Sequence, residues 1–335
     1  MRPETWIRPT PQGLYVEPGD FFIDPARPAA RAVVTHGHGD HARPGNEAVL
    51  ATAETLAIMR ARYGDAAGRS LQALAYGQTL RLGDVTLALA PAGHVLGSAQ
   101  VVLEHRGCRV VVSGDYKRRR DPTCPAFEPQ RCDVFVTEAT FGLPVFTHPD
   151  DAGEIARLLA SVRRNPDRAH LVGVYALGKC QRVIRLLREA GWDAPIHLHG
   201  GLGALCAVYE RAGIALGDLA PIDGTAPRDL AGAIVLAPPS ALADRWSRRL
   251  PDPVTVAASG WMRIKQRAKQ RGVELPLVIS DHADWPELLR SFAEVDAPEI
   301  WVTHGQEDAL VRAAALQGRR GRALRLIGRD EDEGS

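Results

Sequence analysis

The stretch Thr35-His36-Gly37-His38-Gly39-Asp40-His41 places three imidazoles and one carboxylate within six residues, directly after the apolar run 31–34. In an extended backbone alternate side chains point the same way, so His36 and His38 face one side together. Asp40 and His41 follow on the turn and reach a second point nearby. Such a set suits two adjacent metal ions, one held mainly by nitrogen and one by mixed nitrogen and oxygen ligands. The alternative is a group of unrelated surface histidines.

Length and composition are those of an ordinary globular protein. The 335 residues, 45% hydrophobic and 24% charged, allow two domains or one large domain with an insertion. No apolar run approaches the ~18 residues of a membrane span, and the N-terminus lacks a signal-peptide pattern, so we expect a cytoplasmic protein with no membrane partner. The five cysteines show no metal-finger spacing and are odd in number, which predicts buried thiols rather than disulfides.

Positive charge is clustered although the net charge is only +1. Eight basic residues and one acid, Asp252, lie between Arg245 and Arg271, and a second cluster occupies 117–120. Such runs are usually solvated faces, but beside a catalytic centre they could follow a phosphate backbone. The acidic end of the chain, 330–335, is predicted to be disordered.

Five short β-rich runs each end at a residue that can bind metal. These runs and the residues that follow them are 21–23 with Asp24, 109–113 with Asp115, 133–137 with Glu138, 275–280 with Asp281 and His282, and 299–303 with His304. Because α/β sheets place their chemistry outside strand ends, the runs predict a common site on one rim of the sheets. His94, in a glycine-flanked turn, would supply the third nitrogen of the first metal site.

The middle of the chain contains no such strand ends and is predicted to be a second α/β unit. Strand-like runs at 170–174, 196–198 and 233–236 alternate with helical stretches, one spanning about 177–189 with Gly191 just after it and one reaching Tyr209. Since candidate ligands flank this unit on both sides, we interpret it as an insertion. The expected divisions are a metal-binding domain in two parts, an inserted domain and an acidic tail: 1–146 and 275–329, 147–274, and 330–335.

With these residues assembled, the chain resembles the metallo-β-lactamase superfamily and, within it, the β-CASP nucleases. Residues that match the four superfamily elements are Asp24, the stretch 36–41, His94 and Asp115. Glu138, His282 within 280–284 and His304 within 303–305 match the three further β-CASP elements, and all seven follow the family's order. The resemblance implies an α/β fold, namely an αββα metallo-β-lactamase sandwich with an inserted α/β β-CASP domain.

The chain is similar in particular to the bacterial ligase-associated DNA exonucleases, from about residue 13 to 305. The segments that carry this similarity are Gly13-Leu14-Tyr15, Phe22-Ile23-Asp24-Pro25, Ser113-Gly114-Asp115-Tyr116-Lys117, Thr137-Glu138-Ala139-Thr140-Phe141-Gly142-Leu143-Pro144, Tyr175-Ala176-Leu177-Gly178-Lys179, Ala237-Pro238-Pro239-Ser240, Ser259-Gly260-Trp261-Met262 and Ser280-Asp281-His282-Ala283-Asp284-Trp285. Two departures are visible: Ala139 stands where the group usually has serine, and Gly37 and Gly39 replace larger spacers. Neither removes a ligand.

Under this resemblance the metal ligands divide into two sets. The first set is His36, His38 and His94; the second is Asp40, His41 and His304; Asp115 would bridge the two ions. Asp40 is also an expected catalytic residue, and Asp24 is expected to orient a ligand from outside the coordination shell. Two Zn2+ ions, with Mn2+ as the alternative, would lie about 3.5–4 Å apart and generate a bridging hydroxide for in-line attack on phosphorus.

Two further groups of residues would act on the substrate. His282 is the candidate general acid, oriented by Glu138; the alternative is a buried polar contact that joins the two domains. The expected substrate contacts are Lys117, Lys179, Ser259, Trp261, Arg263 and Lys265. Trp261 would stack on a base of a strand held in a cleft closed by the inserted domain, unless it is a core or hinge aromatic.

These features predict a DNA exonuclease of DNA repair that hydrolyses single-stranded or overhanging ends. Partnership with an ATP-dependent DNA ligase and a helicase is implied by the resemblance alone. An RNA-processing β-CASP nuclease is the nearest alternative, because His304 is typical of RNA-directed members. A small-molecule hydrolase would not need Glu138, His282 or an insertion, and a catalytically inactive scaffold protein would be expected to have lost ligands.

Overall fold

The computed structural model describes residues 2–250 and 252–324. It divides the chain into two compact units: a first unit that ends at Phe146 and resumes at His282, and an inserted unit, Thr147–Asp281. The acidic stretch 330–335, expected to be disordered, lies outside the described residues. Among the residues described, no helix has both the length and the apolar character needed to cross a membrane.

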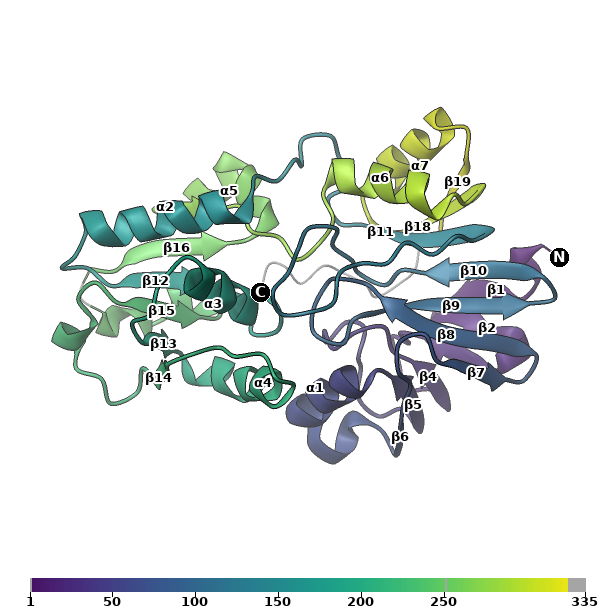
Figure 1. Cartoon of the computed structure of the whole chain (residues 1–335), viewed down its shortest axis with the longest axis horizontal. Helices are drawn as coiled ribbons and strands as arrows, with labels where there is room; N and C mark the ends of the chain where they lie inside the picture. Colours follow the sequence, from purple (N-terminus) through teal and green to yellow (C-terminus); the bar gives the residue numbers. More distant parts are fainter. Residues whose placement is uncertain (1, 251, 325–335) are drawn as a thin grey trace. The chain divides into compact units, whose positions relative to one another are not determined.

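The first unit contains two β-sheets. The six strands of one sheet, in spatial order, are β1 (Ile7–Thr10), β2 (Gly13–Val16), β3 (Phe21–Ile23), β4 (Arg31–Val33), β5 (Ala48–Ala51) and β6 (Ser70–Ala73). The seven strands of the other are β19 (Arg320–Ala323), β18 (Glu299–Gly305), β11 (Val134–Ala139), β10 (Cys108–Val112), β9 (Ala99–His105), β8 (Val85–Pro91) and β7 (Thr79–Leu82). Both sheets are visible in Figure 1.

Apolar clusters show how the first unit is layered. One cluster joins residues of both sheets, such as Ile23 of β3 and Val110 of β10, so the sheets pack face to face. A second cluster packs the outer face of the larger sheet against α6 (Trp285–Val295) and α7 (Glu307–Leu316), and a third packs the smaller sheet against α1 (Ala53–Tyr63). The order helix, sheet, sheet, helix is the αββα sandwich that the sequence predicted.

Strand direction explains why the site lies on one rim. In the larger sheet β10, β11, β18 and β19 are parallel, and β8 shares their direction because both β8 and β10 are antiparallel to β9. In the smaller sheet β3 to β6 are parallel. The carboxyl ends of β3, β4, β8, β10, β11 and β18 therefore bring the residues in or just after their last positions to one edge.

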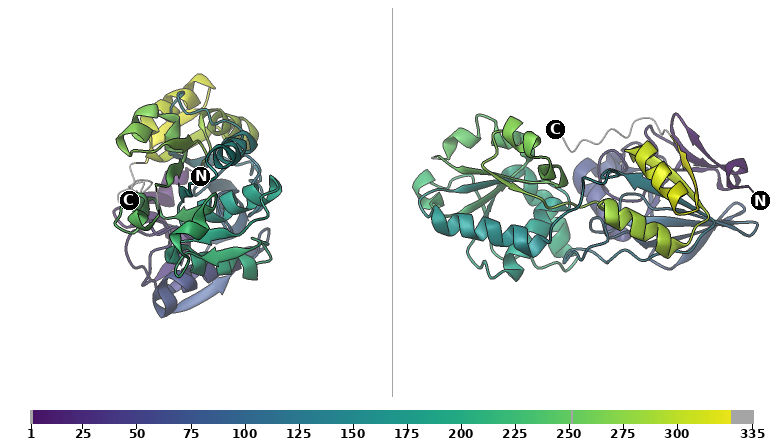
Figure 2. Two further views of the ribbon diagram at one scale, coloured as in Figure 1. Left: turned by 90° about the vertical axis from the view of Figure 1, so that its left-hand side faces the viewer. Right: turned by 90° about the horizontal axis from the view of Figure 1, so that it is seen from above.

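The inserted unit is a six-stranded sheet in which every pairing is parallel. Its strands, in spatial order, are β14 (Leu219–Pro221), β13 (Ile196–Leu198), β15 (Ile234–Ala237), β12 (His170–Gly173), β16 (Val254–Ala258) and β17 (Leu275–Leu277). Its helices are α2 (Asp151–Arg164), α3 (Lys179–Glu189), α4 (Gly200–Arg211) and α5 (Lys265–Gln270). Figure 2 shows α2, in teal, and α5, in light green, on opposite sides of this sheet.

Short 3-10 helices and the burial of the cysteines complete the description. The 3-10 helices are Pro3–Thr5, Glu17–Gly19, Gly64–Ala67, Pro227–Leu230, Pro239–Leu242, Ser247–Arg249 and Gly260–Arg263. Cys108, Cys180 and Cys206 are buried, whereas Cys124 and Cys132 are half-buried.

The second boundary of the insertion differs from the sequence prediction. The first crossing, between Phe146 and Thr147, lies where it was expected, but the chain returns to the first unit at His282 rather than at 275. The apolar run that begins at 275 was expected to be a strand of the metal-binding domain. Instead Leu275–Leu277 forms β17, which pairs with β16 at the edge of the inserted sheet. Strand character was visible in the sequence, but the pairing partner was not.

Two glycines allow the loops at the rim to approach closely. Gly114 has φ +57, and a Cβ there would lie 2.8 Å from the Thr35 side chain. The loop after β10 can therefore approach the loop after β4 only because residue 114 has no Cβ. Gly305 ends β18 with φ +86, and a Cβ there would lie 2.3 Å from the Ala139 carbonyl oxygen of β11. Both positions require glycine for space as well as for conformation.

We predict that Gly305→Ala destabilises the metal-free protein far more than Gly318→Ala does. Gly318 also has positive φ (+75), but nothing lies within 4 Å of its added Cβ. Gly318→Ala should therefore cost only the conformational strain of about 1 kcal/mol, whereas Gly305→Ala adds a backbone clash and should cost about 3 kcal/mol. Urea unfolding followed by circular dichroism measures the difference. Equal midpoints for the two variants would show that the close approach at Gly305 is not needed.

Candidate metal centre

The candidate ligands leave the ends of strands that the fold brings together. His36, His38 and His41 follow β4, His94 follows β8, and Asp115 follows β10. His304 is the second-last residue of β18. Its φ of 31° is unusual for a residue other than glycine. His36, His41, His94 and Asp115 are buried, while His38 and His304 are half-buried.

The first group comprises His36, His38, His94 and Asp115. His38 Nδ1 lies 3.1 Å from His36 Nε2 and 3.0 Å from His94 Nε2. Asp115 Oδ2 lies 3.4 Å from His36 Nε2 and 3.8 Å from His94 Nε2. Three imidazole nitrogens and one carboxylate oxygen thus lie close to one another. These are the residues to which the sequence prediction assigned the first metal.

The second group comprises His41, Asp115 and His304. His41 Nε2 lies 3.4 Å from Asp115 Oδ2, and His304 Nε2 lies 3.1 Å from Asp115 Oδ1. Asp40 lies beside the group, with its Oδ2 3.4 Å from His41 Nε2. Asp115 therefore belongs to both groups and presents one oxygen mainly to each.

Asp24 contacts His41 at Nδ1, the ring nitrogen that faces away from Asp115. Asp24 Oδ2 lies 2.8 Å from His41 Nδ1, and the two Asp24 oxygens also accept hydrogen bonds from the Thr35 backbone N–H (2.7 Å) and hydroxyl (2.6 Å). The hydroxyl of Thr35 in turn lies 3.0 Å from His36 Nδ1. One buried carboxylate thus contacts His41 directly and His36 through the Thr35 hydroxyl, so it can fix ring orientation in both groups.

Burial and charge set the protonation of these groups. Burial lowers the pKa of His36 and holds that of His94 well below its usual value, so both rings are neutral and offer a lone pair. Burial also acts to lower the pKa of His41, but Asp115, Asp40 and Asp24 outweigh it and raise that pKa well above its usual value. Binding a metal at His41 must therefore displace a proton, so metal affinity should fall as the pH is lowered.

The carboxylates stay ionised despite their burial. Burial raises the pKa of Asp40, yet His41 and the other histidines outweigh it and lower the pKa to about 2. The pKa of Asp115 is likewise held well below its usual value by His41 and His36 against the effect of burial. Both carboxylates therefore carry the negative charge that a divalent cation requires.

The donor set fits divalent metal ions. Ligand atoms at about 2.0–2.1 Å from a tetrahedral zinc ion stand roughly 3.3 Å apart, and the separations of 3.0–3.8 Å among the first group bracket that value. In addition, His41 Nε2 is buried and makes no hydrogen bond to any residue that the structure describes. A cation bound between His41 Nε2 and the nearby carboxylates of Asp40 and Asp115 would give this buried nitrogen a partner.

His282 and Glu138 form a third group with Asp115. His282 Nδ1 lies 2.9 Å from Glu138 Oε2, and the His282 ring centroid lies 4.7 Å from that of His94. Glu138 is almost fully buried and accepts hydrogen bonds from the Tyr116 backbone N–H (2.7 Å) and from the Thr140 hydroxyl. The pair predicted from the sequence is thus a hydrogen-bonded dyad beside the histidine groups.

Sequence reasoning overlooked three supporting hydroxyls. Thr35 and Thr140 bind the carboxylates of Asp24 and Glu138, and the Ser98 hydroxyl accepts from the backbone N–H of His94 (3.0 Å). Each of the three lies within four residues of a predicted site residue, which was the available signal. Serine and threonine are so common in turns that proximity alone could not separate them from ordinary turn residues.

Two of the expected phosphate contacts are corrected by the structure. Lys117 and Lys179 are fully buried. Lys117 forms an ion pair with Asp121 and donates to the carbonyl oxygen of His94 (3.2 Å), so it supports a ligand loop. Lys179 lies 3.1 Å from the carboxylate of Asp281. A buried ammonium must be paired to be stable, and both lysines satisfy that need inside the protein rather than on a substrate.

The other expected substrate residues lie on the inserted unit. Ser259 caps the 3-10 helix Gly260–Arg263, and its hydroxyl accepts from the backbone N–H of Trp261 (3.3 Å). Trp261 is half-buried, and the guanidinium of Arg267 lies 3.9 Å from the centre of its ring. Arg263 and Lys265 are exposed.

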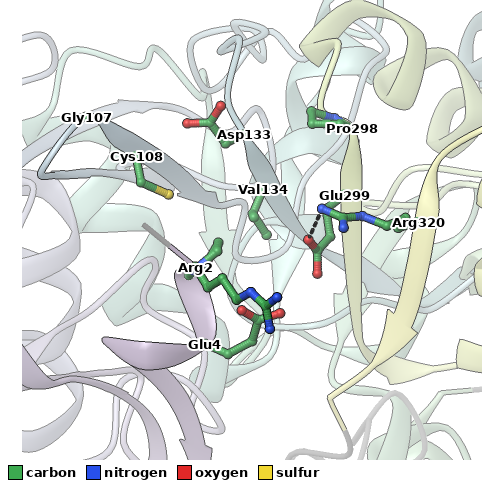
Figure 3. A pocket seen from close by; sticks show the side chains of 10 residues that line it. Arg2, Glu4, Gly107, Cys108, Asp133, Val134, Pro298, Glu299 and Arg320 are labelled. Atoms are coloured by element: carbon green, nitrogen blue, oxygen red, sulfur yellow. Dashed lines mark hydrogen bonds and ion pairs between the residues drawn. The ribbon is translucent and has the colours of Figure 1, made fainter.

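A hollow in the first unit lies away from the candidate metal ligands. It measures about 500 Å³ and lies where β10, β11, β18 and β19 begin, at the opposite end of these strands from the ligands. Figure 3 shows its charged side chains, Arg2, Glu4, Asp133, Glu299 and Arg320. Arg320 lies 3.0 Å from Glu299, so charges of both signs compensate one another there.

Comparisons with known proteins agree with this description. No family model matches the chain. A protein of Opitutus terrae named "Probable DNA ligase" is 32% identical over 298 residues, which are 88% of this chain and 28% of that protein. "Endoribonuclease ysh1" of Aspergillus fumigatus is 30% identical over 153 residues (42% of this chain, 17% of that protein), and "Cleavage and polyadenylation specificity factor 73" of Drosophila melanogaster is 32% identical over 130 residues (36% and 19%).

A solved structure shares the fold. A protein of unknown function from Enterococcus faecalis aligns with a TM-score of 0.56 at 13% identity, covering 81% of this chain and 74% of that one. The chain spans less than a third of the length of the curated relatives named above.

The fold, the ligand groups and these relatives define a metallo-β-lactamase-fold protein with the β-CASP pattern of motifs. The similarity to the "Probable DNA ligase" covers most of this chain, whereas the similarity to each of the other two relatives covers less than half of it.

We predict that metal-free protein takes up two equivalents of Zn2+ and is stabilised by them. At a free zinc concentration 100 times the Kd, stability should rise by about 2.7 kcal/mol for each independent site. Because Asp115 belongs to both groups, Asp115→Asn should weaken both sites, whereas Asp84→Asn, an exposed residue paired with Arg81, should weaken neither. Calorimetric titration with metal analysis measures the stoichiometry. Unaltered uptake of two ions by Asp115→Asn would contradict the shared role.

Proposed function

We propose that this chain is a zinc-dependent phosphodiesterase that degrades DNA from single-stranded or overhanging ends. The observation that carries the proposal is the His282–Glu138 dyad. It forms a group with Asp115, which also belongs to both histidine groups, and within each group the ligand atoms lie within 4.8 Å of one another. Metal ligands alone would serve a hydrolase of any small ester or amide. A protonated imidazole beside two metal sites suits a reaction whose leaving group is an alkoxide, as in cleavage of a phosphodiester.

The chain's residues divide the chemical work. His36, His38 and His94 would hold one ion, His41, Asp40 and His304 the other, and Asp115 both. Bound metals supply Lewis acidity, which lowers the pKa of water and offsets negative charge on the phosphodiester. Zinc is proposed because five imidazoles and two carboxylates are ligands that zinc accepts, and Mn2+ is the alternative.

His282 is proposed to donate the proton to the leaving oxygen. Because Nδ1 faces Glu138 at 2.9 Å, Nε2 is the nitrogen that would transfer the proton. The Glu138 carboxylate stabilises the imidazolium form and fixes the ring, and its own position is fixed by the Tyr116 N–H and the Thr140 hydroxyl. The general-acid step therefore rests on residues that the fold holds rigidly.

The choice of nucleic acid rests on the relatives and on exposed cations. Arg263 and Lys265 are proposed contacts to backbone phosphates, and Trp261 and Ser259 to the adjoining nucleotide. Similarity over most of the chain to a protein named "Probable DNA ligase" favours DNA and a role in repair beside a ligase. A helicase partner is proposed on the family resemblance of the sequence alone.

An RNA-processing nuclease is the second candidate. Relatives named as endoribonucleases match 36–42% of this chain at 29–32% identity, and His304 approaches Asp115 at 3.1 Å as a ligand would. The similarity to these proteins is confined to a smaller part of the chain than the similarity to the "Probable DNA ligase".

Timed digestion of end-labelled single-stranded DNA and of RNA of the same sequence tests the proposed function. We expect stepwise loss of DNA nucleotides with Zn2+ or Mn2+, and no product from Asp40→Ala, which removes a proposed ligand. Comparing 5′ with 3′ labels gives the polarity. Preferential cleavage of RNA would favour the second candidate, and cleavage of neither polymer by metal-loaded protein would refute both.

We predict that His282→Ala retains both metal ions but loses turnover by about 10²–10⁴-fold, the usual contribution of a general acid. The loss should be smallest for a substrate with a good leaving group, such as a p-nitrophenyl phosphodiester, because that group needs no proton. Metal analysis and the two rate constants provide the measurement. Loss of metal in parallel with activity would instead make His282 a ligand, and equal losses on both substrates would make it structural.

We predict that replacing Arg263 and Lys265 by alanine lowers the salt dependence of DNA binding. Each backbone phosphate contact to a single strand contributes about 0.7 to the slope of log K against log salt, so the slope should fall by about 1.4. Fluorescence anisotropy of chelator-treated protein measures binding without cleavage. A slope equal to that of the unchanged protein would exclude these two residues from the binding surface.

A further inference from the structure

A hollow of about 480 Å³ on the inserted unit is lined almost entirely by one helix. Its lining residues are Arg157, Ala160, Arg163 and Arg164 of α2 and Leu275 of β17. We call it the α2 hollow. None of these residues belongs to the metal groups or to the proposed substrate contacts, so nothing described so far accounts for three arginines around one depression.

Helix geometry makes the hollow both open and basic. Arg157 and Arg164 are seven residues apart, which is close to two helical turns, so their side chains leave the helix in nearly the same direction. Ala160 lies between them and is too small to fill the space. Leu275, on the edge strand β17, closes the side, because α2 packs against that strand.

The positive charge in the α2 hollow is only partly compensated. Arg157 donates to both carboxylate oxygens of Glu154, at 2.9 and 2.7 Å, and Glu154 Oε2 also accepts from the Val278 backbone N–H at 2.7 Å. Neither Arg163 nor Arg164 forms an ion pair with any residue in the part of the chain that the structure describes. About two positive charges therefore remain at the hollow.

A purely structural explanation covers only part of this arrangement. Arginines in the last turn of a helix interact favourably with its C-terminal dipole, and Arg164 Nε donates to the Ala160 carbonyl oxygen at 3.3 Å. That interaction does not explain Arg157, which lies mid-helix, or the open space over Ala160. The charged hollow of the first unit shown in Figure 3 differs as well, because acidic and basic side chains pair within it.

We propose that the α2 hollow binds a phosphate ester, and that the phosphate belongs to the backbone of a nucleic-acid strand. Guanidinium groups present planar pairs of N–H donors that match phosphate oxygens, and three of them around one depression favour an anion. A free nucleotide shares this chemistry and is the other possible source. The proposal that the phosphate belongs to a nucleic acid rests on the proposed nuclease function. The proposal that the α2 hollow binds an anion does not depend on that function.

The test is oligonucleotide binding by the full chain with metals removed, so that cleavage cannot interfere. Anisotropy of a fluorescein-labelled 30-nucleotide DNA, titrated at several salt concentrations, compares the unchanged protein with Arg163→Ala/Arg164→Ala. We expect the double variant to bind on the order of 10-fold more weakly at 0.1 M salt, and the slope of log K against log salt to fall by about 1.4. Ala160→Glu, which places a carboxylate in the hollow, should act in the same direction.

Matched variants separate a specific site from general charge. Arg211→Ala/Arg228→Ala removes the same charge from exposed positions elsewhere on the inserted unit and should change the affinity far less. Arg163→Lys/Arg164→Lys keeps the charge but not the paired donors, and should restore the slope and only part of the affinity. Thermal unfolding of each variant confirms that it is folded.

The outcomes decide both the site and its source. If AMP or inorganic phosphate binds the unchanged protein but not the double variant, while oligonucleotide binding is unaltered, the nucleic-acid source is overturned. If neither probe distinguishes the double variant from the Arg211/Arg228 control, the site itself is overturned. Hydrolysis of bis(p-nitrophenyl) phosphate, which has a single phosphate and cannot occupy two phosphate sites at once, should be equal in all variants. Its absence from the unchanged protein would count against the proposed nuclease and not against the hollow.

Discussion

The buried carboxylate of Asp115 is the constraint on which the rest of the first unit depends. Its Oδ2 faces His36, His41 and His94, its Oδ1 faces His304, and it also adjoins the Glu138–His282 dyad. An ionised carboxylate inside a protein is unstable unless cations or hydrogen-bond donors surround it. The loops after the strands supply those partners, and together they form a site whose charge a divalent cation would balance.

The surrounding backbone is strained where it serves that site. Asp24 and His304 have positive φ, 45° and 31°, although neither is glycine. Such conformations cost about 1–3 kcal/mol each and persist only when neighbouring contacts enforce them. Asp24 is held by Thr35 and His41, and His304 lies in a strand paired with β11. The strain is therefore offset by hydrogen bonds and by the sheets, which keep the ligands in place.

The inserted unit contains two kinds of basic residue: buried ones in ion pairs and exposed ones on its surface. Inside it, Lys179 and Arg182 are fully buried and pair with Asp281, and Arg182 also pairs with Asp151. Removing one partner of such a buried network costs about 3–5 kcal/mol, because the other charge is left uncompensated. Arg163, Arg164, Arg263 and Lys265, by contrast, are exposed. Exposed cations such as these can meet a polyanion, whereas the buried lysines near the sequence motifs cannot.

The amino-acid sequence by itself determined the candidate ligands, because strand periodicity and chemically unusual residues within motifs point to them without knowledge of their neighbours. Six of these candidates, His36, His38, His41, His94, Asp115 and His304, lie in the two groups that the fold brings together. It also indicated many of the strands and the start of the insertion, since apolar runs mark strands directly, whereas the αββα layers were implied by the resemblance to the metallo-β-lactamase superfamily. Only the tertiary structure decided that Lys117 and Lys179 are buried ion pairs and that 275–277 joins the inserted sheet. Burial and strand pairing depend on residues distant in the chain, and a local pattern carries no information about which distant partner is chosen.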